Sequence, residues 1–120
     1  MTPKTFLSIR IDSVVGKIGA KQIAFLEAIQ SQGSITGAGR FTGLSYRGAR
    51  LMIDAINKAL CEPAVSTTIG GDKRGGATLT PVGTQLVGLY RAIEVRTRAV
   101  AVPEREALLR LMRTKRVSHR

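Results

Sequence analysis

The sequence is poor in the residues that build disulfides, metal centres and acid–base pairs. It holds one cysteine, Cys61, and one histidine, His119, among 120 residues. A single cysteine cannot form an intrachain disulfide, and the two residues together cannot supply the Cys and His ligands of a typical zinc site. The eight acidic residues show no paired motif for general acid–base catalysis. We therefore expect no enzyme activity, metal or cofactor, and we expect Cys61 to act as a small hydrophobic residue.

Long apolar runs are also missing. No uninterrupted apolar stretch approaches the roughly 20 residues that a membrane-spanning helix needs. The N-terminal residues lack the apolar core of a secretory signal. The sequence therefore predicts a cytoplasmic protein that does not enter a membrane.

What the sequence has in excess is positive charge. Nineteen Lys and Arg residues against eight Asp and Glu residues give a net charge of +11. Such a surface attracts polyanions, of which nucleic acid is the first candidate and an anionic membrane the competitor. Because 43% of the residues are hydrophobic, the chain can still form a modest core and is not a disordered basic tail.

The stretch from Ser34 to Asn57 has the pattern of two short helices joined by a tight turn. Ser34 and Ser45 are typical N-caps, and Gly43 supplies the backbone freedom that such a turn often needs. In the second helix, predicted over residues 45–60, apolar residues recur at helical spacing and leave a polar face opposite them. These apolar residues are Ala49, Met52, Ile53, Ile56, Ala59 and Leu60. The pattern indicates a helix-turn-helix, and an ordinary small helical domain is the alternative.

The polar face of the second helix is cationic at its N-terminal end, where a recognition helix meets base edges in the DNA major groove. We expect Arg47 and Arg50 to bind guanine edges or phosphates, and Tyr46 and Ser45 to contact the backbone or a thymine methyl group. Asp54 should repel phosphate, so only the first turns should enter the groove. The predicted backbone contacts from the first helix are Ser34, Thr36 and Arg40.

The residues before this pair predict a strand and a supporting helix. From Phe6 to Asp12 apolar and polar residues alternate, which is the period of a half-buried strand. Residues 20–31 carry apolar side chains at helical spacing. Gly37 and Gly39 indicate a close backbone approach, either to a neighbouring helix, which we favour, or to a phosphate.

The residues after the pair predict a hairpin with a basic tip. Pro63 blocks continuation of the helix, and residues 64–69 are β-prone. The sequence GGDKRGGA at 70–77 then places Lys73 and Arg74 between glycine pairs. This is typical of the wing of a winged helix, which can bind phosphates or the minor groove. A nucleotide-binding loop is the rival, but its GxxxxGK[ST] pattern is missing.

A long helix should follow the hairpin, because Thr80 is a good N-cap and Pro81 suits the first helical position. We expect its apolar stripe to form a dimer interface, with packing inside the chain as the alternative. The stripe consists of Val82, Leu86, Leu89, Tyr90 and Ile93. The sequence thus divides into a domain over residues 1–98 and a basic C-terminal helix and tail over residues 99–120.

In this order the segments resemble the DNA-binding domain of ModE-type molybdate-responsive regulators, which is related to the LysR-type winged helix. The likeness covers residues 6–93, and its most specific pieces are GSITGAG at 33–39, LSYRGA at 44–49, the Glu62-Pro63 pair, GGDKRGGA at 70–77 and LTPVG at 79–83. The resemblance implies a bacterial or archaeal protein, mainly α with a small β wing, that dimerises through its flanking helices. It also implies that Ser45, Tyr46, Arg47 and the wing face an operator.

Two departures from the family bear on function. Arg50 stands where the family usually has tryptophan, and Lys73 and Arg74 occupy a wing that is usually plainer glycine, so the operator should differ. Only about forty residues follow the wing, too few for an oxyanion-binding domain. We therefore do not expect molybdate sensing on this chain.

The sequence as a whole predicts a sequence-specific, homodimeric transcriptional regulator that binds double-stranded DNA and associates with the nucleoid. Two alternatives stay open. One is a nonspecific nucleoid or RNA-associated architectural protein, because a net charge of +11 attracts any polyanion. The other is an adaptor that pairs with a full-length regulator through residues 80–98, and the C-terminal helix is a further candidate for binding a protein partner.

Overall fold

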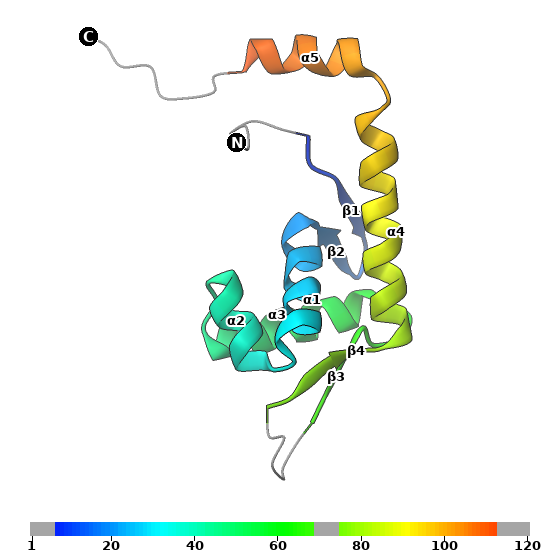
Figure 1. Ribbon diagram of the computed structural model, residues 1–120. Coiled ribbons are helices and arrows are strands. Elements are labelled where there is room, and N and C mark those ends of the chain that lie inside the picture. The colour runs from blue at the N-terminus through cyan, green and yellow to red at the C-terminus, as the bar shows by residue number, and fades with distance from the viewer. Residues whose placement is uncertain (1–6, 69–74, 113–120) are drawn as a thin grey trace, which may run out of the picture.

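The computed structural model describes residues 7–68 and 75–112. Over these residues the fold is mainly α, with two small antiparallel sheets of two strands each (Figure 1). No described helix combines the length and the apolar character that crossing a membrane requires. The elements in chain order are β1 (Arg10–Ser13), β2 (Gly16–Gly19), α1 (Ala20–Gln32), α2 (Ile35–Thr42), α3 (Tyr46–Ala59), β3 (Val65–Thr67), β4 (Ala77–Leu79), α4 (Pro81–Arg98) and α5 (Val102–Leu111).

Helix α1 lies at the centre of the core. Its apolar stripe is fully buried, and the helix contacts β2, α2, α3, β4 and α4. The stripe consists of Ile23, Phe25, Leu26, Ala28 and Ile29. The predicted supporting helix is thus confirmed, and it holds α2, α3, β4 and α4 around one core.

Three helices begin at hydroxyl caps that the sequence predicts. The side chains of Ser34, Ser45 and Thr80 each accept a hydrogen bond from the backbone N–H three residues later, at 2.9, 3.0 and 3.1 Å. Each bond satisfies one of the free N–H groups of a first helical turn. The local sequence therefore sets the starts of α2, α3 and α4.

The N-terminal strand differs from its prediction. Strand β1 is exposed along its whole length, so it is not half-buried. It forms a hairpin with β2, which the sequence did not predict, and Ile18 of β2 enters the core instead. At the hairpin turn, a Cβ added to Gly16 would lie 2.8 Å from Cβ of Ala59, so the turn lies directly against the end of α3.

Helix α4 is attached to the rest of the chain by Tyr90 and Arg91. The Tyr90 side chain is 1% exposed, and its hydroxyl donates a hydrogen bond to the carbonyl oxygen of Ile9 at 2.6 Å. Desolvation by this burial raises the pKa of the Tyr90 hydroxyl. Tyr90 is therefore a core residue, and its expected place on an exposed dimer stripe is wrong. Of that stripe, Leu89 and Ile93 remain exposed.

Arg91 forms two hydrogen bonds with Glu27 of α1, at 2.9 and 2.6 Å, and a third with Glu94 at 2.6 Å. The bonds from Arg91 hold the pKa of the Glu27 carboxyl below its usual range. This pair joins α1 to α4 across the edge of the core.

The last helix, α5, turns away from the end of α4 and has no buried residue (Figure 1). Ala101 forms the corner with a φ of 53° in the left-handed region. The Arg105 guanidinium donates to the carbonyl oxygens of Thr97 and Arg98 at 3.1 and 3.0 Å, so it caps the end of α4. The predicted C-terminal helix is confirmed, and it lies outside the core.

Candidate nucleic-acid interface

Helices α2 and α3 are joined by the predicted tight turn. Gly43 ends α2 with a φ of 78°, and the N–H of Leu44 donates to the carbonyl oxygen of Gly39 at 2.7 Å. A Cβ on Gly39 would lie 2.9 Å from the Leu44 oxygen and 3.4 Å from the Cβ of Ala49 on α3. Gly39 therefore allows the two helices to pack closely, as the sequence indicates.

Helix α3 separates an apolar face from a polar one. Ala49, Ile53 and Ile56 are buried in the core. Tyr46 and Arg47 in the first turn are exposed, and Arg50 in the second turn is half-buried. The cations predicted to read bases thus lie at the N-terminal end of a helix that is firmly packed on its other side.

A second group of predicted residues lies at the start of α2. Thr36 and Arg40 are exposed one turn apart, on one side of the helix, and Ser34 precedes them as the half-buried cap. Ser34 and Ser45 use their side-chain oxygens to accept the capping hydrogen bonds, which leaves their hydroxyl protons free to donate to a phosphate.

The β3–β4 hairpin is fastened to the start of α2. The N–H of Ile35 donates to the oxygen of Gly75 at 2.9 Å, and the N–H of Ala77 donates to the oxygen of Gly33 at 3.1 Å. This connection brings the end of the hairpin at which β4 begins beside Ser34. The sequence predicted the hairpin but not this bridge, because no residue pattern marks it. Lys73 and Arg74, the cations predicted at the tip, lie outside the described residues.

Asn57 has a different role from the one its position on the polar face suggests. Its side-chain oxygen accepts from the N–H groups of Ala64 and Val65 at 2.8 and 3.2 Å, and its amide donates to the Val65 oxygen at 3.3 Å. Asn57 therefore joins the end of α3 to β3 and is not available to DNA.

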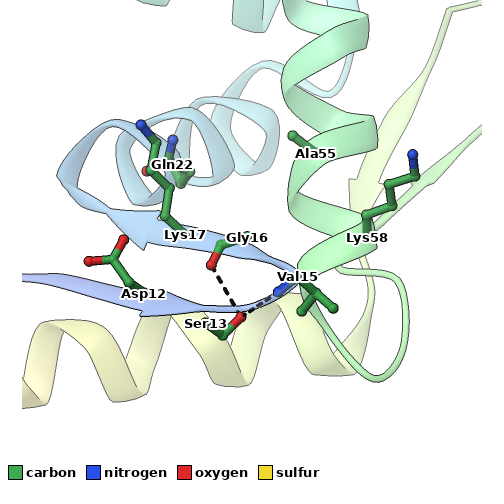
Figure 2. Close-up of a pocket in the computed structure, with 8 residues that line it drawn as sticks. All are labelled: Asp12, Ser13, Val15, Gly16, Lys17, Gln22, Ala55 and Lys58. Carbon is green, nitrogen blue, oxygen red and sulfur yellow. Dashed lines mark hydrogen bonds between the residues drawn. The ribbon is translucent and has the colours of Figure 1, made fainter.

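A cavity of about 450 Å³ lies between the β1–β2 hairpin and the C-terminal half of α3 (Figure 2). Lys17 on β2 and Lys58 on α3 lie on either side of it, and Ala55 lies between them. The sequence does not predict this cavity, because the cavity is formed in part by strand β2, which is itself not predicted. The two lysines extend positive charge to the far end of α3.

Two further observations concern side chains that could carry chemistry in the described part of the chain. Cys61 lies just beyond the end of α3, and its side chain is exposed. Within residues 7–68 and 75–112, no three His, Cys, Asp or Glu side chains come together as a metal site.

These features define a small, strongly basic, mainly helical protein with an exposed cationic turn at the start of one packed helix. No family model matches the sequence. The chain is similar, at 45% identity over 78 residues, to the molybdenum-pterin-binding protein MopB of Rhodobacter capsulatus, with 65% of this chain and 29% of that protein aligned. It is also similar to several proteins named ModE.

The molybdenum transport protein ModE of Azotobacter vinelandii is 39% identical over 97 residues, which cover 79% of this chain and 36% of the relative. The transcriptional regulator ModE of Yersinia pestis is 39% identical over 70 residues, which cover 58% and 27%. The chain therefore spans about a third of the length of the curated relatives it matches. These relatives support the resemblance to ModE-type proteins that the motifs indicate.

Proposed function

We propose that residues 1–98 form a winged helix-turn-helix that binds DNA as part of a ModE-type transcriptional regulator, with residues 99–120 as an appended basic helix and tail. Helix α3 enters the major groove, and the hairpin beside α2 is the wing. The observation that carries the proposal is the exposed first turn of α3, where Tyr46 and Arg47 project from a helix whose other side is buried. No catalytic step is involved.

The surroundings of α3 support this orientation. Thr36 and Arg40 on α2 are exposed, and the end of the hairpin at which β4 begins lies against Ser34. A backbone phosphate beside the groove would thus meet the Arg40 cation and the hydroxyls of Ser34 and Thr36 from α2 while α3 reads the bases. Lys73 and Arg74 are also proposed phosphate contacts, because their position between two glycine pairs is typical of the tip of a wing.

We further propose that the regulator is a homodimer. Leu89 and Ile93 lie one turn apart on α4 and are 56% and 40% exposed, with Val82 and Leu86 half-buried on the same stripe. Burying the first two against a second copy removes apolar surface from water. Tyr90 is not part of this interface, because its side chain is buried in the core.

A binding-site selection from random DNA, followed by affinity measurements with two arginine variants, tests the proposal. Arg47→Ala should weaken binding to the selected site by about 5-fold to 150-fold and reduce the preference over scrambled DNA, because a bidentate base contact is worth about 1–3 kcal/mol. Arg110→Ala, which removes an exposed charge of α5, is the matched control and should weaken both duplexes slightly and equally.

Two results would count against this function. A selection that returns no motif at physiological salt favours the nonspecific nucleoid or RNA-associated protein. A selected motif whose binding responds to Arg47→Ala no more than to Arg110→Ala means that α3 does not enter the groove.

A further inference from the structure

One residue on the outer face of α3 has no role in the core or in the contacts proposed above. Leu51 is 57% exposed, whereas Ala49, Ile53 and Ile56 of the same helix are buried. At about 100° per residue, Leu51 lies about 40° around the helix from Arg47. Leu51 is therefore close to the centre of the exposed face, opposite the buried stripe.

The position of Leu51 along α3 also places it within reach of the groove. It follows Arg47 by one turn, about 6 Å along the helix axis, and it precedes Asp54. If Arg47 is at the bases, the next turn is still within reach of the groove, and Asp54 limits deeper contact by repelling phosphate. Leu51 is thus the last residue on this face before the acidic side chain.

The chemistry of leucine restricts what it can bind there. An aliphatic side chain neither donates nor accepts a hydrogen bond, so it gains only from an apolar partner. In the major groove the only apolar group on a standard base edge is the 5-methyl of thymine. A 5-methylcytosine presents the same methyl group in the same position of the pyrimidine ring.

A protein partner fits this surface less well. The neighbours of Leu51 on the outer face include the charged residues Arg47, Asp54 and Lys58, all exposed, and the small residue Ala55. Exposed apolar patches of several hundred Å² mark protein interaction sites. One leucine among charges suits a single methyl group better.

We propose that Leu51 is a specificity-determining residue that contacts the 5-methyl group of a pyrimidine in the major groove. This inference rests on the proposed function, because it requires α3 to enter the groove. Leu51 would then recognise a methyl group, next to the guanine edges or phosphates that Arg47 and Arg50 contact.

The test replaces each thymine of the selected site in turn by deoxyuridine, which removes only the methyl group. At one position in each half-site, wild-type affinity should fall about threefold to tenfold, the expected effect of losing one apolar carbon. Leu51→Ala should lose a similar factor on the thymine duplex and become indifferent to the uridine. Leu51→Met, which stays apolar, should keep the methyl dependence. Leu108→Ala, an exposed leucine of α5, is the matched control and should behave as wild type.

A second arm replaces each cytosine by 5-methylcytosine. A gain in wild-type affinity of similar size that disappears in Leu51→Ala assigns the methyl group to 5-methylcytosine and also supports the proposal. Methyl effects that are absent from wild type in both arms, or that persist unchanged in Leu51→Ala, overturn it.

The Arg47→Ala variant separates this failure from failure of the proposed function. If Arg47→Ala still reduces preference for the selected site while methyl groups have no effect, only the role of Leu51 is wrong. If Arg47→Ala behaves like its control and the methyl groups also have no effect, α3 does not read DNA and both proposals fail. Because Leu51 is exposed, its variants should fold, and circular dichroism checks this.

Discussion

Two glycines of α4 differ in what a side chain at their position would meet. A Cβ on Gly83 would collide with the carbonyl oxygen of Ala64, whereas a Cβ on Gly88 has nothing within 4 Å. Alanine is favoured over glycine inside a helix by about 1 kcal/mol. Gly88→Ala should therefore raise the free energy of unfolding by about 0.5–1 kcal/mol. Gly83→Ala should lower it by about 1–3 kcal/mol, because α4 must move away from the segment that leads into β3.

Urea unfolding followed by circular dichroism measures both changes. The two variants make the same chemical substitution in the same helix, so each serves as the control of the other. Stabilisation of the protein by both substitutions would mean that α4 does not pack against Ala64 as described.

At the scale of single residues, the sequence predicts roles that depend on near neighbours and misses roles that depend on distant ones. The caps Ser34, Ser45 and Thr80 are predicted correctly, because each bonds to a backbone group three residues away. Tyr90 is misjudged, because its partner is Ile9, and helical spacing says nothing about that contact. The bonds from Asn57 to Ala64 and Val65 are not predicted for the same reason.

The contact between α1 and α4 makes stability depend on pH in a definite direction. The hydrogen bonds from Arg91 lower the pKa of Glu27 in the folded protein. A lowered folded pKa stabilises the fold above the ordinary carboxyl pKa of about 4.5 and loses this contribution as pH falls through the folded value. Glu27→Gln should therefore be less stable than wild type at pH 7, and the difference should shrink as the pH falls below 4.5.

The expected size at pH 7 is at most about 1 kcal/mol, because the side chains of Arg91 and Glu27 are 41% and 39% exposed and solvent screens the pair. Urea unfolding at pH 7 and pH 3 measures the change. Glu106→Gln, on the exposed side of α5, is the control and should show no such dependence on pH. A Glu27→Gln deficit that is equally large at pH 3 would show that the pair is not the cause.

At the scale of elements, length decides what the sequence can predict. Helices α1, α3 and α4 contain 13 to 18 residues, enough for several turns of apolar repeat, and all three are predicted close to their ends. Strand β2 contains four residues, two of them glycines, so no alternation is visible. The cavity beside α3 is missed together with β2, whereas the first turn of α3, which carries the proposed base contacts, is predicted.

At the scale of the whole molecule, a substitution on the exposed face of α4 tests the proposed dimer. Because Leu89 is exposed in the single chain, Leu89→Asp should leave the fold intact while placing a charge at the centre of the proposed interface. The dimer dissociation constant, measured by sedimentation equilibrium, should rise at least about tenfold. Thr84→Asp, exposed on the other side of the same helix, should leave it unchanged.

The same variants connect assembly to DNA binding. Two copies of α3 related by a dimer axis should read half-sites about one helical turn apart. Leu89→Asp should then weaken binding to the full site while leaving binding to an isolated half-site as in wild type, because each chain keeps its own α3. Wild-type protein that sediments as a monomer at micromolar concentration, or a selected site that is short and asymmetric, would remove the dimer and leave α3 reading DNA from a single chain.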